Sequence, residues 1–195
     1  MRFPARHVVT LVALLGFATA CGLSSSSTAA SQRPTLAPYV PSPQDVVDRM
    51  LALADVTSKD VLYDLGSGDG RIVITAARKY GARGVGIDID SERIDESRRN
   101  ARAAGVGSLV EFRRGDILDA DVSNATVVTL YLVSSANLKL RPLLTRQLAP
   151  GARIVSHAFG MGDWTPAKVD RFKDSRGDDR VIYMWVADGR VRPAP

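Results

Sequence analysis

Three aspartates stand at the ends of three consecutive segments that the sequence predicts to be strands. Asp64 lies near the end of the first segment, Asp88 ends the second, and Asp116 follows the third. In a parallel sheet the carboxyl ends of the strands meet at one edge, where open α/β sheets bind their ligands. A single aspartate of this kind is more often a helix cap or a turn residue. The joint placement of three on consecutive strand ends favours a binding site for one ligand.

A glycine-rich turn with the sequence DLGSGDGR separates the first predicted strand from the helix that follows it. Gly66, Gly68 and Gly70 let the backbone turn sharply and approach a ligand, while the first N–H groups of the helix point at it. This combination predicts a nucleotide-like ligand. The dinucleotide fingerprint G-x-G-x-x-G, counted from Gly66, would need a glycine where this chain has Arg71. An NAD-dependent oxidoreductase is therefore disfavoured.

The three carboxylates suit different parts of such a ligand. Asp64, two residues before the first glycine, would repel a pyrophosphate and attract an ammonium group. Asp88, twenty residues after Gly68, can accept hydrogen bonds from ribose hydroxyls. Asp116 can accept a hydrogen bond from an adenine amino group.

Strand and helix patterns alternate along the folded part of the chain. Apolar residues at helical spacing over 44–54 predict a leading helix, with Ser42 as its cap and Pro43 in its first turn. The strands expected after it are 60–65, 84–88, 110–113, 125–132, 152–159, 168–173 and 181–187, and the helices are 71–80, 91–104 and 136–148.

This alternation predicts the topology of the sheet. Five strand-to-helix steps in series require a mostly parallel sheet covered on both faces, because parallel neighbours need crossover connections. The last two strands flank a polar turn with no helix between them, which predicts an antiparallel hairpin at the sheet edge. The expected fold class is α/β, with a doubly wound, mostly parallel seven-stranded sheet and an antiparallel C-terminal hairpin.

The glycine turn, Asp88 and Asp116 resemble, in order and spacing, the motifs of class I methyltransferases that use S-adenosylmethionine. The resemblance covers nearly all of the chain from Tyr39 onward and implies the Rossmann-like methyltransferase fold. In that family the turn and the first acid hold the methionine end of the cofactor, the second acid holds the ribose, and the third holds the adenine. The residues that the resemblance assigns to cofactor binding are Asp64, Gly66, Gly68, Gly70, Asp88 and Asp116.

Four shorter segments resemble one group within that family. They are 39–43 (YVPSP), 129–132 (TLYL), 140–142 (LRP) and 161–164 (MGDW). The group contains the mitochondrial lysine methyltransferases of the ATP synthase c subunit and of the adenine nucleotide translocase, with their bacterial relatives. This likeness implies methyl transfer to a protein lysine. A small-molecule methyltransferase and a non-catalytic exported nucleotide-binding lipoprotein stay as alternatives.

Three polar residues at or beyond the ends of the fourth and fifth predicted strands are catalytic candidates. A lysine amine must be neutral to attack a methyl group, and desolvation in an aromatic pocket lowers its pKa. Tyr131 is expected to line such a pocket and to accept the hydrogen of the amine, with a structural tyrosine as the equal alternative. His157 and Asp163 can bind or deprotonate a substrate, although a lone histidine is more often structural.

Composition limits the partners of the chain. The net charge of +5 is small for 195 residues, and the arginines between 59 and 114 are interspersed with acidic residues. No nucleic-acid surface is therefore predicted. One cysteine and two distant histidines give no metal-ligand spacing, so no metal site is expected.

The N-terminal residues differ in composition from the rest. Arg2 and Arg6 precede an uncharged run that ends in Ala-Thr-Ala, the pattern of an export signal. Cys21 follows directly and resembles the lipidated cysteine of bacterial lipoproteins. We expect a membrane-anchored or periplasmic protein attached through Cys21, with a cytoplasmic location as the alternative. The expected organisation is a signal peptide at 1–20, a flexible tether at 21–38 and a methyltransferase domain at 39–195.

Overall fold

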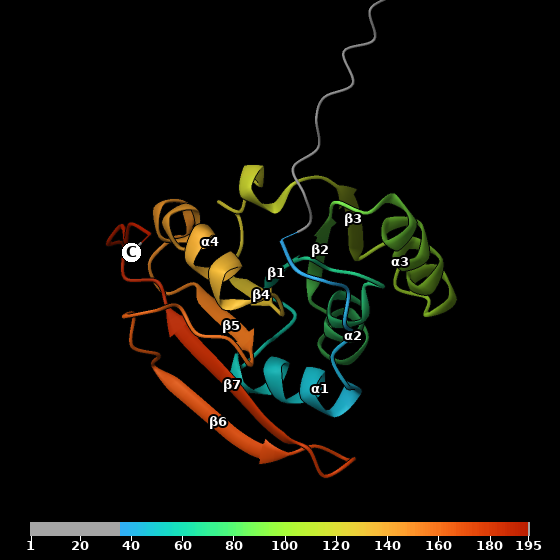
Figure 1. Ribbon diagram of the computed structural model, residues 1–195. Coiled ribbons are helices and arrows are strands. Elements are labelled where there is room, and N and C mark those ends of the chain that lie inside the picture. The colour runs from blue at the N-terminus through green and yellow to red at the C-terminus, as the bar shows by residue number, and fades with distance from the viewer. Residues whose placement is uncertain (1–35, 195) are drawn as a thin grey trace, which may run out of the picture. The chain divides into compact units, whose positions relative to one another are not determined.

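The computed structural model describes residues 36–194 (Figure 1). Its helices are α1 (Gln44–Leu53), α2 (Arg71–Tyr80), α3 (Ser91–Ala103) and α4 (Ser134–Gln147), with one 3₁₀ helix, η1 (Ile117–Asp119). Its strands are β1 (Val61–Leu65), β2 (Arg83–Asp88), β3 (Val110–Arg114), β4 (Val127–Leu130), β5 (Arg153–His157), β6 (Lys168–Lys173) and β7 (Asp179–Val186). The predicted signal peptide, Cys21 and most of the tether lie outside these residues. Within 36–194, no helix has both the length and the apolar composition to cross a bilayer.

The seven strands form one sheet in the order β3-β2-β1-β4-β5-β7-β6. The first five are parallel, β7 runs antiparallel to β5, and β6 pairs antiparallel with β7 at the edge (Figure 1). This confirms the expected mostly parallel sheet with a C-terminal hairpin. From β1 the chain adds β2 and β3 on one side, and then crosses to add β4 and β5 on the other side. Ligands of open α/β sheets bind at the point where the strand order reverses in this way.

Two apolar cores lie on opposite faces of the sheet. One contains Leu62 of β1 and Val127 of β4 together with the buried faces of α1, α2 and α3. The other contains Tyr63 of β1 and Val128 of β4 together with α4 and η1. Because successive strand residues point to opposite faces, neighbours in the sequence enter different cores. Both faces are covered, which confirms the doubly wound arrangement.

Fewer crossovers contain an α-helix than the five strand-to-helix steps that the sequence predicted. Three of the crossovers contain an α-helix, but β3 and β4 are joined by η1 alone. Asp116 caps this single turn, and Asp121, Ser123 and Asn124 after it favour turns over a continued helix. Strand β4 is also shorter than expected and ends at Leu130, so Tyr131 lies just beyond it.

The cap predicted for α1 is wrong. Pro43 is the N-cap residue, and no side chain there bonds to the first turn. The hydroxyl of Ser42 instead lies 3.1 Å from Nδ1 of His157 at the end of β5. A tertiary contact has replaced a local one, which the spacing of residues along the chain could not reveal.

A glycine in β2 brings the turn after β1 close to the sheet. A Cβ atom at Gly86 would lie 2.6 Å from the ring of Phe112 and 2.7 Å from Oγ of Ser67. Real side chains do not tolerate such distances. The missing side chain at position 86 therefore lets Ser67 and the glycine turn lie directly against β2.

Candidate active site

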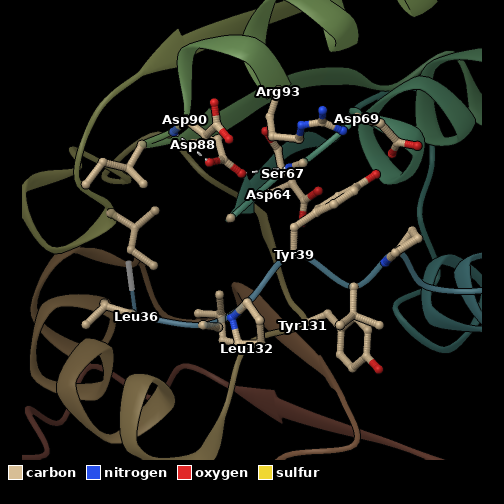
Figure 2. A pocket seen from close by; sticks show the side chains of 18 of the residues that line it. Leu36, Tyr39, Asp64, Ser67, Asp69, Asp88, Asp90, Arg93, Tyr131 and Leu132 are labelled. Carbon is tan, nitrogen blue, oxygen red and sulfur yellow. Dashed lines mark hydrogen bonds between the residues drawn. The ribbon is translucent and has the colours of Figure 1, made fainter. Parts of the chain in front are cut away.

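A cavity of about 370 Å³ opens at the carboxyl edge of the sheet (Figure 2). Asp64 of β1, Asp88 of β2, Asp116 after β3 and Tyr131 after β4 all line it. The volume is in the range of small-molecule sites. The structure thus gathers four of the residues that the sequence singled out, from four different strand ends.

The glycine turn after β1 is held against the end of β2 by three N–H groups. Gly66 and Ser67 donate to the carbonyl of Ile87 at 2.8 and 3.0 Å. Gly68 donates to Oδ2 of Asp88 at 2.8 Å. The backbone of Gly66 and Gly68 has positive φ, 82° and 51°, which favours glycine at both positions. Both line the cavity, as expected.

Gly70 has a different place from the other two turn glycines. It is the left-handed N-cap of α2, with φ 80°, and does not line the cavity. A Cβ atom there would lie 2.6 Å from the ring of Phe112 and 2.8 Å from Cβ of Ser97. The expected direct contact of Gly70 with the ligand is therefore corrected: this residue supports the turn from the side of the core.

Asp64 is more buried than the other carboxylates of the cavity, with 2% of its surface exposed. Burial raises its pKa to about 7 against the opposing effect of a hydrogen bond from the Thr129 hydroxyl, and the charges of Asp88 and Asp69 raise it further. The Thr129 hydroxyl lies 2.8 Å from Oδ1. A cationic group entering the cavity would favour the ionised form, because an opposite charge nearby stabilises it.

Asp88 and Asp116 also bond to the backbone. Oδ1 of Asp88 accepts a hydrogen bond from the N–H of Asp90 at 3.0 Å, and Oδ1 of Asp116 accepts one from Leu118 at 2.9 Å. Each carboxylate oxygen has two lone pairs and can accept more than one hydrogen bond. Both aspartates therefore combine the turn role considered from the sequence with a position that suits ligand binding.

Ser67 is a candidate ligand contact that the sequence analysis did not identify. Its hydroxyl is buried at the cavity wall and has no hydrogen-bond partner among the described residues. Buried polar atoms normally find partners, so this oxygen suits a polar ligand. Its position between two turn glycines is the only sequence signal that could have marked it. Among residues 36–194, no group of His, Cys, Asp and Glu is arranged to hold a metal ion.

Residues 36–42, which we call the strap, line the cavity from the side opposite the sheet edge (Figure 2). The ring of Tyr39 lies so close to the glycine turn that a Cβ atom at Gly68 would be 2.5 Å from it. The guanidinium of Arg93 lies 4.8 Å from the centroid of the same ring. Tyr39 therefore links the strap to the turn and to α3.

Arg71 fixes the strap from the start of α2. Its Nη1 donates to the carbonyl of Ser42 at 2.8 Å, and its Nη2 pairs with Asp69 of the glycine turn at 2.6 Å. In the sequence, Arg71 serves only to exclude a dinucleotide. Its bond to the strap joins positions 29 residues apart, which no local motif predicts.

Tyr131 stacks on His157, with ring centroids 4.0 Å apart and ring planes at 29°. His157 is 1% exposed and does not line the cavity. Burial lowers its pKa to about 4, with a further lowering by Arg180 and an opposing effect of Asp174. An imidazole with this pKa is a poor proton acceptor for an ammonium group. The geometry therefore favours contact with Tyr131 over the predicted proton transfer.

Asp163 lies away from the cavity. It pairs with Arg141 of α4 in a second hollow that Trp164 and Pro193 also line. Arg141 also donates to the carbonyls of Met161 and Pro193, at 3.0 and 2.8 Å. The prediction of Asp163 as a catalytic residue is corrected. Asp163 pairs with Arg141, which also bonds to the C-terminal residue Pro193.

Comparisons with known proteins agree with this geometry. The family model described as the ANTKMT methyltransferase domain matches residues 64–168. A protein-lysine N-methyltransferase of Saccharolobus islandicus (strain REY15A) is 42% identical over 76% of this chain and 92% of its own length. A solved RNA methyltransferase from Salinibacter ruber, in complex with S-adenosyl-L-homocysteine, is 57% identical over 78% of this chain and 97% of its own, with a TM-score of 0.73.

A longer relative is also similar. The Homo sapiens lysine N-methyltransferase of the ATP synthase c subunit is 32% identical over 68% of this chain. The match spans 56% of the human protein, little more than half of its length.

The raised pKa of Asp64 predicts that affinity for a ligand with an ammonium group rises with pH. Below pH 7 the carboxyl group is mostly protonated in the ligand-free chain, and binding the ammonium group then requires loss of that proton. The affinity for S-adenosylhomocysteine should increase about tenfold between about pH 6 and about pH 8, as measured by calorimetry. Asp64→Asn should bind more weakly and lose this slope. An equal slope in the variant would exclude Asp64 as its cause.

Proposed function

We propose how this chain carries out its reaction. The premise is that it belongs to the family of the ANTKMT methyltransferase domain and is an S-adenosylmethionine-dependent methyltransferase. The observation that carries the proposal is the set of carboxylates from consecutive strand ends around one cavity. The expectations taken from the resemblance to class I methyltransferases are confirmed for fold, reaction and cofactor.

The residues around the cavity fit S-adenosylmethionine. The buried hydroxyl of Ser67 lacks a partner among the described residues, and the buried Asp64 accepts a hydrogen bond from Thr129 but forms no ion pair within residues 36–194. Both are polar groups that a ligand with an ammonium group and hydroxyls would satisfy. Gly66 and Gly68 add no side chain of their own to this wall of the cavity, where Leu132 and the ring of Tyr39 lie close to the turn.

Each cofactor-binding residue has a role that follows from its place. Asp64 and the turn at Gly66 and Gly68 hold the methionine end, while the N–H groups of the two glycines stay bonded to the end of β2. Asp88 accepts hydrogen bonds from the ribose, and Asp116 accepts one from the adenine. Gly70 keeps the turn in shape without touching the ligand.

The cofactor supplies a methyl group that its sulfonium already activates for transfer to a nucleophile. The chain therefore has to align the nucleophile and exclude water, and needs no covalent residue. Tyr131 and Leu132 line the cavity on the side of the strap away from Asp88 (Figure 2). This end receives the methyl acceptor, and the hydroxyl of Tyr131 accepts a hydrogen bond from its amine.

The acceptor is a protein lysine. The cavity is lined by Asp64, Asp69, Asp88, Asp90 and Asp116 against two arginines, Arg71 and Arg93. This excess of carboxylates attracts the ammonium group of the cofactor and disfavours a phosphate backbone near the cavity. The protein-lysine N-methyltransferase from Saccharolobus supports the same substrate class. The similar RNA methyltransferase from Salinibacter makes RNA the second candidate.

Transfer of a labelled methyl group separates these substrates. The purified chain, with methyl-labelled S-adenosylmethionine and a cell extract, should label material that protease destroys and ribonuclease leaves intact, and hydrolysis should yield methylated lysine. Acetylating the lysines of the extract beforehand should abolish the label, and Asp64→Asn should give little. Label that ribonuclease removes would contradict a protein substrate and favour RNA. Label only in small molecules would favour the small-molecule alternative.

Tyr131→Phe tests the role of the hydroxyl. The variant keeps the ring and its stacking, so the affinity for S-adenosylmethionine should change by less than about twofold. If the hydroxyl bonds to the amine in the transition state, kcat should fall by about tenfold or more, the scale of a hydrogen bond to a charged group. Calorimetry and steady-state kinetics measure the two effects separately. An unchanged kcat would leave Tyr131 with a structural role only.

The chain is exported and lipid-anchored through Cys21. Support comes from the sequence alone, in the basic start at Arg2 and Arg6, the uncharged run and the Ala20-Cys21 junction. A single acyl chain binds membranes only weakly, and stable anchoring needs at least two. Fractionation with lipid labelling should find the wild type labelled in the membrane and Cys21→Ser unlabelled. Full-length, unlabelled wild type in the cytosol would refute this location.

A further inference from the structure

The end of β5 has a strained backbone that the cofactor site does not use. Ala158, directly after His157, has φ +66°, in the left-handed region that alanine rarely adopts. Its N–H donates to the carbonyl of Val181 in β7 at 2.8 Å, and the N–H of Phe159 donates back to His157 at 2.9 Å. Strain of this kind persists only where the surroundings impose it, and it is common at functional sites.

This strained turn brings two rings onto Tyr131. His157 stacks on it at 4.0 Å between centroids, and Phe159 at 6.4 Å, with ring planes at 29° and 25°. Tyr131 itself lines the cavity, whereas the other two rings do not. The ring of Tyr131, which faces the cavity, is therefore held in place by the rings of His157 and Phe159, which lie outside the cavity lining.

The buried imidazole has a second contact, with the strap. The hydroxyl of Ser42 shares a hydrogen bond of 3.1 Å with Nδ1 of His157, and both residues are buried. The carbonyl of Ser42 accepts the bond from Arg71, which pairs with Asp69 of the glycine turn. One strap residue thus connects the cofactor-binding turn to the rings around Tyr131.

Local charge is compatible with this contact. The Arg180–Asp174 ion pair, 2.7 Å long, influences His157 from the β6–β7 hairpin. The burial of His157 and its lowered pKa, about 4, keep the ring neutral near pH 7. A neutral imidazole has one nitrogen able to accept the hydrogen of the Ser42 hydroxyl.

We propose that Ser42 and His157 form a positioning pair that sets the ring of Tyr131 at the methyl-acceptor end of the cavity and ties this setting to the strap. The inference rests on the proposed function, since it assumes that the acceptor enters beside Tyr131. His157 does not touch the acceptor and is a positioning residue. Losing the bond between the pair affects how the acceptor is held more than how the cofactor is bound.

A double-mutant cycle tests the pair. Ser42→Ala removes the hydroxyl, and His157→Phe keeps a ring to stack on Tyr131 but removes the nitrogen. Each should raise the acceptor KM or lower kcat, with kcat/KM for the acceptor falling about threefold to tenfold, the range of one hydrogen bond. The affinity for S-adenosylhomocysteine should stay within about twofold, because the Ser42 carbonyl remains available to Arg71.

The double variant and a conservative variant identify the cause. The double variant with Ser42→Ala and His157→Phe should lose no more kcat/KM for the acceptor than the more affected single variant, because both changes remove the same bond. Ser42→Thr retains a hydroxyl and should recover most of the loss. Losses that multiply in the double variant, or no effect of Ser42→Ala, would overturn the proposal. If His157→Phe does not fold, the comparison of Ser42→Ala with Ser42→Thr still tests whether the hydroxyl at position 42 is required.

A second readout does not depend on methyl transfer. Hydrogen exchange at the strap amides of Tyr39, Val40 and Ser42, measured with S-adenosylhomocysteine bound, should be faster in Ser42→Ala and His157→Phe to the same extent. Unchanged exchange in both variants would refute the link between the strap and His157. If the wild type transfers no methyl group to any acceptor but these exchange rates change together, the proposed function fails and the pair stands.

Discussion

The hydrogen bonds between the glycine turn and the end of β2 are the contacts on which the rest of the site depends. Gly66 and Ser67 share the carbonyl of Ile87, and Gly68 donates to the side chain of Asp88. These bonds fix a sharp turn against the neighbouring strand and keep the Ser67 hydroxyl at the cavity. Asp88 therefore shapes the turn and, in the role that we propose for it, also presents carboxylate oxygens to the cofactor.

Burial of Asp64 gives the site its chemical character. A carboxylate in a buried strand is costly unless a donor or a cation compensates for its desolvation. The Thr129 hydroxyl compensates in part, while the nearby Asp88 and Asp69 act in the opposite direction. A ligand that brings its own positive charge relieves this cost, so a cationic group is favoured beside Asp64.

The two ends of the cavity are built from different parts of the fold. The cofactor end comes from the parallel strands and their turns, which many α/β proteins share. The acceptor end that we propose lies beside the strap and Tyr131, near the strained turn at Ala158, whose N–H donates to the carbonyl of Val181 in β7. This division agrees with relatives that share the methyltransferase domain but whose names give protein lysine in one case and RNA in another.

Much of the fold and of the cofactor end is contained in the sequence, because both depend on local patterns. The helical composition of the residues after the glycine turn predicted α2 with its observed bounds, and alternating strands and helices predicted a parallel sheet. The carboxyl ends of parallel strands lie at one edge of the sheet, so Asp64, Asp88 and Asp116 necessarily meet around one cavity there. Glycine spacing identified the turn, although it could not separate Gly68, which faces the cavity, from Gly70, which faces the core.

The contacts that only the tertiary structure decided join residues far apart in the chain. Ser42 had a good local position for capping α1, yet it bonds to His157, 115 residues away. Asp163 follows β5 as predicted, but it lies away from the cavity and pairs with Arg141 of α4. Sequence spacing records which backbone geometry is favourable within a few turns of the chain. Which side chains then meet depends on how whole elements pack, and no spacing rule contains that information.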